Sequence, residues 1–193
     1  AERALNAAAT AAPDLPALRV ARSNLRDLRE RLASGARQAA ITPTQSAQVH
    51  KLVSQAETAA AKGELIVPPG DSAYDKYRAA LAIDGSDSAA RAGIARLPAR
   101  AKALFAQALT DGAPKRARGL FDTLRQLAPD DVALASMSGK LGSAFIDQAD
   151  AFISEGHRLR AAQALDAARQ LSPNDARLAP LDARLRAMSG NQG

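Results

Sequence analysis

A segment that recurs every 44 residues constrains the fold of this chain most strongly. Leu127–Asp131 (Leu-Ala-Pro-Asp-Asp) and Leu171–Asp175 (Leu-Ser-Pro-Asn-Asp) are near copies whose prolines lie 44 residues apart. A further step of 44 residues towards the N-terminus reaches Ile83–Asp87, in which Gly85 takes the place of proline. Self-similarity at a fixed period of about 20–50 residues is the signature of a repeat architecture. We therefore expect a short array of similar units.

Small and large apolar residues precede each proline, or Gly85, at steps of four and three. This spacing places their side chains on one face of a helix. A proline five residues later ends that helix, because it lacks an N–H group and clashes with the preceding turn. The Asp or Asn that follows can cap the next helix. The expected core positions are Ala73, Tyr77 and Ala80, then Ala117, Phe121 and Leu124, then Ala161, Leu165 and Ala168, with a similar half-motif at Ala1, Leu5, Ala8 and Pro13.

The composition of the chain favours helices over strands. Alanine, the best helix former, fills 48 of the 193 positions, and only 3% of the residues are aromatic. Leu65–Val67 is the only short run of strand type, and Pro68 ends it. We therefore predict an all-α protein. Helices are expected over residues 2–12, 16–35, 43–63, 71–84, 87–111, 114–128, 131–156, 158–172 and 175–188.

The order of alanine, bulky apolar residue, small apolar residue and proline resembles the second helix of a tetratricopeptide (TPR) repeat. Gly112 and Gly156 lie five residues before the alanine of their units, where that family turns between its two helices. The resemblance covers residues 64–188 and implies antiparallel helical hairpins stacked as a short TPR-like solenoid. Two features differ from the family. The period is 44 rather than about 34 residues, and the first-helix aromatic is missing because the chain has no Trp.

From the repeat and the TPR resemblance we predict three parts of the chain. Residues 1–63 are interpreted as an N-terminal helical half-repeat with capping helices, because solenoids need atypical terminal units to cover their open ends. Residues 64–188 hold the TPR-like repeats, and residues 189–193 are expected to form a disordered tail.

The segment Gly63–Asp84 also resembles part of the TPR-like domains of bacterial envelope proteins, including membrane-anchored Ser/Thr protein kinases. That resemblance implies a periplasmic sensor or docking unit, which would be the ectodomain of an inner-membrane protein. The kinase or other effector would then lie outside this chain. The alternative location is the cytoplasm. The residues themselves support a structural interpretation. Leu65–Val67 would lie as an apolar plug across the end of a helix pair, and Asp71 or Ser72 would cap the next helix.

No pattern of catalytic or metal-binding residues is present in the sequence. The chain has no Cys, and its two histidines, His50 and His157, are far apart. Neither a phosphate-binding glycine-rich loop nor an HExxH or EF-hand motif occurs, and no serine lies in a nucleophile elbow. No stretch reaches the roughly 20 apolar residues of a membrane span. We therefore predict a protein that is not an enzyme and that needs no cofactor or metal.

Two basic clusters, Lys115–Arg118 and His157–Arg160, follow the turn glycines of successive units in a chain of net charge +6. The 44-residue period aligns Arg116 with Arg160, so the turns are expected to stack into a basic edge. Such an edge can receive an acidic protein segment or another anion. The alternative is that the aliphatic parts of these arginines cover alanine-rich helices while the charged ends face solvent. A further stripe, at Arg19, Arg22, Arg26 and Arg29, is interpreted as such a solvated face. The candidate partner-binding residues are Arg116, Arg118, Arg158 and Arg160.

Three functions remain open from the sequence. The favoured one is a non-catalytic protein-interaction or sensory module with a protein partner. The second is an architectural or oligomerisation element of a larger envelope protein. The third is binding of anions or nucleic acid by the basic edge. It is disfavoured for nucleic acid, because single-strand binding uses stacking aromatics, and four of the six aromatic residues are expected in the core: Tyr77, Phe121, Phe145 and Phe152.

Overall fold

The computed structural model describes residues 20, 23–30 and 41–190. Within these ranges the chain forms helices and no strand, which confirms the predicted all-α class. Residues 23–30 are helical and carry the second half of the arginine stripe. The half-motif at the start of the chain and the first predicted helix lie outside the described residues.

Seven further helices follow residue 41, and each begins and ends within three residues of its predicted bounds. They are α3 (Pro43–Lys62), α4 (Ala73–Ile83), α5 (Ser88–Thr110), α6 (Pro114–Leu127), α7 (Ala133–Ser154), α8 (Arg158–Leu171) and α9 (Leu178–Gly190). Helix α9 continues to Gly190, and the disordered tail predicted over residues 189–193 stays a prediction. Met188 packs against the core, so the last turn of this helix is held by apolar contact. Residues 191–193 lie outside the described part.

Hydrogen bonds from polar side chains fix where several helices begin. Ser72 is fully buried and caps α4, and its hydroxyl donates to the Asp75 carboxylate at 2.6 Å and accepts from the Asp75 N–H at 3.2 Å. This is a capping box, and it selects Ser72 rather than Asp71 as the cap. Asp87 caps α5 by accepting from the Ala90 N–H at 2.7 Å. Asp131 and Asp175, at steps of 44 residues, accept in the turns before α7 and α9, from the N–H groups of Ala133 and Arg177 at 2.9 and 3.0 Å.

Helices α3, α5 and α7 end in the same kind of turn. Each is followed by a glycine with positive φ, Gly63 (86°), Gly112 (65°) or Gly156 (81°), a conformation that glycine adopts without steric cost. The residue after each glycine donates its N–H to a carbonyl five residues back, as in Ala113 to Ala108 at 2.8 Å. Such bonds satisfy the free carbonyls of a helix end. We call these three residues the turn glycines.

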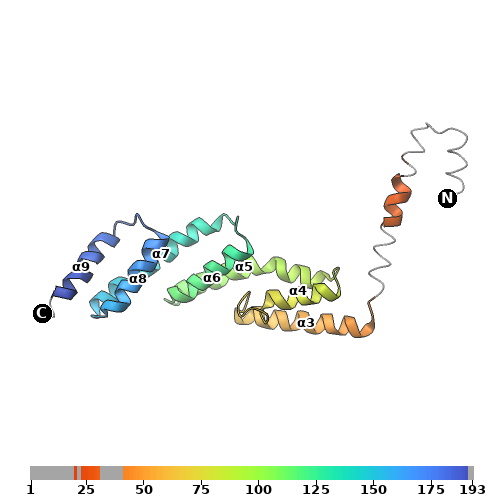
Figure 1. Cartoon of the computed structure of the whole chain (residues 1–193), viewed down its shortest axis with the longest axis horizontal. Helices are drawn as coiled ribbons and strands as arrows, with labels where there is room; N and C mark the ends of the chain where they lie inside the picture. The colour runs from red at the N-terminus through yellow and green to blue at the C-terminus, as the bar shows by residue number, and fades with distance from the viewer. Residues whose placement is uncertain (1–19, 21–22, 31–40, 191–193) are drawn as a thin grey trace, which may run out of the picture.

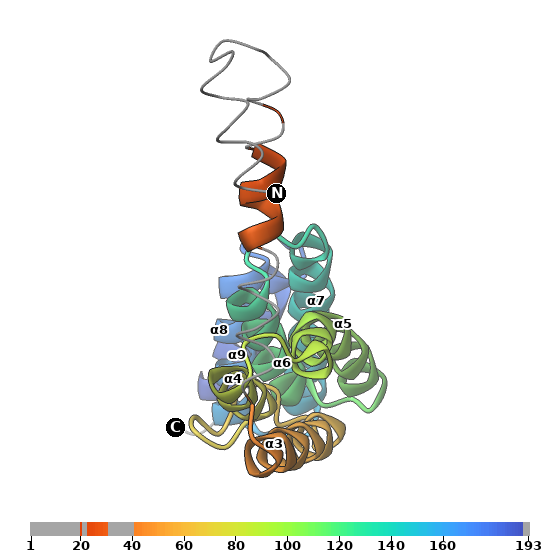
Figure 2. The same ribbon diagram turned by 90° about the vertical axis from the view of Figure 1, so that its right-hand side faces the viewer.

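The helices pack mainly on their neighbours in the sequence. The most extensive contacts join α3 to α4, α5 to α6 and α7 to α8, with additional contacts between α3 and α5 and between α7 and α9. Figure 1 shows these pairs following one another in an elongated row from α3 to α9, and Figure 2 views the row from the α3 end.

The apolar core follows the predicted spacing. All nine predicted core positions between Ala73 and Ala168 are buried, with at most 6% of any side chain exposed. Leu65 is buried as expected of a plug, but Val67 is 60% exposed, so only part of that run covers the helix pair. Phe152, expected in the core, is half-buried and lies beside the basic edge.

Candidate functional site

The predicted basic edge lies in the first turns of α6 and α8, where two of its four arginines are paired locally. Arg116 lies 3.4 Å from the Asp111 carboxylate, and Arg118 donates to Asp122 at 3.1 Å. Exposed pairs of this kind contribute only about 0–1 kcal/mol. They nevertheless neutralise much of the charge that these two arginines would offer to a partner.

Arg160 is in a different environment from Arg116 and Arg118. Its guanidinium lies over the ring of Phe152, 6.0 Å from the centroid, in a favourable cation–π geometry. Together with Lys115 it lines a hollow of about 380 Å³, which we call the basic hollow. Its lining residues are Lys115, Phe145, Gln148, Phe152, Arg160, Gln163 and Ala164. The structure therefore brings the two predicted clusters together through Lys115 and Arg160, whereas Arg116 and Arg158 lie outside the hollow.

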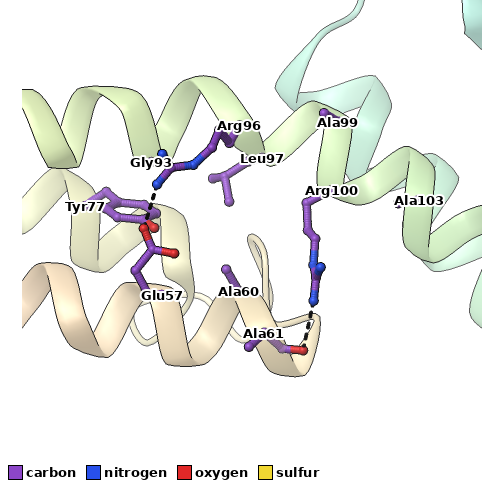
Figure 3. Close-up of a pocket in the computed structure, with 10 residues that line it drawn as sticks. All are labelled: Glu57, Ala60, Ala61, Tyr77, Gly93, Arg96, Leu97, Ala99, Arg100 and Ala103. Atoms are coloured by element: carbon purple, nitrogen blue, oxygen red, sulfur yellow. Dashed lines mark hydrogen bonds and ion pairs between the residues drawn. The ribbon is translucent and has the colours of Figure 1, made fainter.

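A second hollow, the α3–α5 cleft, has a volume of about 470 Å³ (Figure 3). Across it, Arg96 of α5 donates to the Glu57 carboxylate of α3 at 2.7 Å. Arg100, one turn further along α5, reaches the carbonyl of Ala61 at 3.5 Å. The cleft is lined by Glu57, Ala60, Ala61, Tyr77, Gly93, Arg96, Leu97, Ala99, Arg100 and Ala103.

Tyr77 of α4 forms the floor of the α3–α5 cleft. Its side chain is only 1% exposed, and Figure 3 shows its hydroxyl end, Glu57 and Arg96 directed toward one another. Burial, followed by hydrogen bonding to the Glu57 carboxylate, raises the pKa of Tyr77 to about 12. The phenol therefore stays protonated at neutral pH and serves as a hydrogen-bonding group.

The α3–α5 cleft offers hydrogen-bond donors over an apolar floor. Two guanidinium groups and one buried phenol can donate, and Glu57 is the only carboxylate among the described residues that line the cleft. No His, Ser or Cys occurs among the described residues of this lining. The arrangement can hold a polar or acidic group of a bound molecule in place.

Neither histidine lines either hollow, although the ring of His157 lies edge-on to Phe152, with 6.3 Å between the ring centroids. His50 is exposed on α3, and His157 precedes α8 with its Nε2 atom 3.7 Å from the Glu155 carboxylate. Within the described ranges, no group of three or more His, Cys, Asp or Glu side chains could hold a metal ion. No helix in the described part of the chain is both long and apolar enough to cross a membrane.

Comparison with protein-family models, with curated proteins and with solved structures finds no match to this chain. None of the residues of the α3–α5 cleft is predicted to be functional from the sequence. A pattern that could have drawn attention to Arg96 is present, since Arg96, Lys140 and Arg184 form a series of cations spaced 44 residues apart. The acidic partners do not follow that period, so the pairing of Arg96 with Glu57 was hidden.

Proposed function

We propose that this chain is a non-catalytic protein-interaction or sensory module built from TPR-like helical hairpins. The observation that carries the proposal is the extended row of helix pairs, which leaves hollows with charged rims between successive helices. Stacked hairpins use such extended surfaces to bind other proteins. The α3–α5 cleft and the basic hollow both combine apolar floor with cationic rim, which fits a partner segment that is both apolar and acidic.

We place this module in the periplasm, as the extracytoplasmic part of a membrane-anchored bacterial signalling protein such as a Ser/Thr kinase. The support is the resemblance of residues 63–84 to segments of such domains. In this segment the Ser72–Asp75 capping box fixes the start of α4, and the Ala73 N–H donates to the Glu64 carbonyl at 2.8 Å. The segment thus has a structural task in the stack.

Affinity capture from an envelope extract tests the binding function. The wild-type chain is compared with an Arg116/Arg118/Arg158/Arg160→Glu variant, and the retained proteins are identified by mass spectrometry. The matched control reverses four charges on exposed side chains elsewhere, at Lys51, Lys62, Arg91 and Arg186. A specific protein retained by the wild type and the control but lost from the test variant supports docking at the basic edge.

The other outcomes of this capture are equally informative. Equal retention by both variants moves the contact to another surface, such as the α3–α5 cleft. No specific retention by any form of the chain argues against an interaction module.

An architectural or oligomerisation role is the second candidate, favoured by two exposed apolar side chains. Val132 is 95% exposed and Leu159 is 73% exposed, and Leu159 lies between the arginines at the start of α8. Light scattering over a range of concentrations distinguishes the roles. A mass that doubles with concentration and returns to that of a monomer in a Leu159→Asp variant supports self-association.

A further inference from the structure

The three turn glycines provide a common origin for counting positions along α3, α5 and α7. Each of these helices ends in the same hydrogen-bonded turn, so residues at equal distances before the turn glycine occupy equivalent places. The residue six positions before the turn glycine is Glu57 in α3, Ala106 in α5 and Asp150 in α7. Two of these three equivalent positions therefore carry a carboxylate, and the middle one does not.

A cation of α5, α7 or α9 lies opposite each of these positions. These cations are Arg96 in α5, Lys140 in α7 and Arg184 in α9, spaced 44 residues apart. Arg96 pairs with Glu57 at 2.7 Å, and Arg184 pairs with Asp150. The third cation, Lys140, has Ala106 as its counterpart. Lys140 makes no ion pair among the described residues, and the position equivalent to Glu57 and Asp150 carries no carboxylate.

A second ion pair is missing from the same interface. Between α7 and α9, Arg177 also pairs with Asp147 at 3.1 Å. The residues 44 positions earlier, which would make the same contact between α5 and α7, are Ala133 and Ala103. Alanine thus takes the place of charged residues on the sides of α5 and α7 that face each other, and Lys140 is the one member of these pairs that persists there. The backbones of α5 and α7 also approach less closely than those of α3 and α5 or of α7 and α9.

The replacement leaves an open hollow, which we call the α5–α7 groove, with a volume of about 340 Å³. Lys140 and Ala106 both line it, and Lys102 lies at the rim, paired with Asp131 at 2.8 Å. Its floor consists of the side chains of Phe105 and Met137, with the half-buried Leu109 beside them. The groove thus combines an apolar floor with one ammonium group that lacks a counter-ion.

We propose that the α5–α7 groove binds an acidic amphipathic segment of a partner protein. A carboxylate of that segment pairs with Lys140, in the place that Glu57 and Asp150 occupy in the neighbouring interfaces. A large apolar side chain beside the carboxylate packs on Phe105 and Met137. The inference rests on the proposed interaction function and assigns it a site and a partner chemistry. A second copy of this chain is a poorer occupant, because its net charge of +6 repels itself.

A random peptide display library provides the probe, with the full chain as bait. We expect the enriched peptides to carry Asp or Glu next to a large apolar residue. Their affinity for Lys140→Glu and for Ala106→Asp should fall about tenfold or more, the effect of losing a charge-assisted hydrogen bond. Ala106→Asp is the sharper variant, since it supplies the missing carboxylate from within the chain and leaves Lys140 in place. Helicity and melting temperature establish that both variants are folded.

Lys51→Glu is the matched control, because Lys51 is exposed on α3, far from the groove in the sequence, and the substitution makes the same charge change. It should leave the affinity of the enriched peptides unchanged. Peptides that bind both groove variants as well as they bind the wild type would overturn the groove while leaving the interaction function standing. If no peptide is enriched by the wild type, both fail. Self-association that Ala106→Asp abolishes would identify a second copy as the occupant and overturn the partner proposed here.

Discussion

The ring of Tyr77 in α4 lies so close to Gly93 in α5 that a Cβ atom at position 93 would be 2.3 Å from two ring atoms. Such a distance is far inside van der Waals contact, so α5 can approach α4 here only because position 93 has no side chain. The ring is 1% exposed and has little room to move. This contact sets the depth of the α3–α5 cleft, whose floor is Tyr77.

Replacing Gly93 with alanine is expected to destabilise the protein. Alanine in a helix interior is favoured over glycine by about 0.5–1 kcal/mol, but forcing a methyl group into a packed interface costs about 1–3 kcal/mol. We therefore expect a net loss of stability, seen as a lower urea midpoint with an unchanged slope. Gly139→Ala in α7 is the control, since Gly139 is exposed and a Cβ there would meet nothing within 4 Å. That variant should be more stable than the wild type by about 0.5–1 kcal/mol. Equal gains from both substitutions would contradict the close packing of Tyr77 on Gly93.

A charge at a core position of α8 is expected to unfold the helix stack. Leu165 is fully buried, and an unpaired carboxylate there would lose its hydration without gaining a partner. Leu165→Asp should lose cooperative thermal unfolding and much of its helical circular dichroism. Leu159→Asp makes the same change in the same helix at a site that is 73% exposed, and its stability should stay within about 0.5 kcal/mol of the wild type. A normal melting temperature for Leu165→Asp would refute the register of the core.

The ion pair that the α5–α7 interface lacks can be supplied by mutation and its strength measured. A double-mutant cycle of Ala106→Asp and Lys140→Gln isolates the interaction of the two side chains from the lower helix propensity of aspartate. We expect a favourable coupling of about 0.2–1 kcal/mol, as for other exposed pairs. The coupling should shrink at high ionic strength because salt screens exposed charges. A coupling of zero at low salt would show that position 106 does not face Lys140.

Acid should weaken the hydrogen-bonded turns that precede α7 and α9. Hydrogen bonds from Arg177 lower the pKa of Asp175 from its ordinary value of 3.8 to about 2, and Lys102 lowers the pKa of Asp131. A carboxyl group whose pKa is lower in the folded state stabilises the fold above its unfolded pKa, and this contribution is lost as the pH falls through the folded value. The melting temperature should therefore decrease between about pH 4 and pH 2. Asp175→Asn should lower the melting temperature at neutral pH and flatten this dependence. An unchanged pH profile in that variant would contradict the role of Asp175.

Much of the local structure could be predicted from the sequence, because it depends on neighbours in the chain. Steps of four and three located core residues such as Phe121 and Leu165, and the aspartates after Gly85 and the prolines located the helix starts. The turn at Gly112 follows equally from its place before the alanine motif. The all-helical class is confirmed by the helices of the described residues. Stacking as a TPR-like solenoid stays a prediction.

The candidate sites were harder to predict, because they depend on which helices lie side by side. Under the 44-residue period, Glu57 aligns with Ala101, so its equivalence to Asp150 is invisible until positions are counted from the turn glycines. Phe152 was assigned to the core by its apolar character. In the structure it lies under the guanidinium of Arg160, at the rim of the basic hollow.

The connection after α3 spans residues 63–72, whereas those after α5 and α7 span only residues 111–113 and 155–157. Glu57 nevertheless pairs with Arg96 of α5 in the same way as Asp150 pairs with Arg184 of α9. The length of a connection is therefore independent of the helix contacts, provided that the glycine turn at the end of the preceding helix is kept. The connection after α3 already contains a longer loop than the other two. The short turns after α5 and α7 are therefore the places where an epitope or a fluorescent reporter could be inserted without changing the packing of the helices.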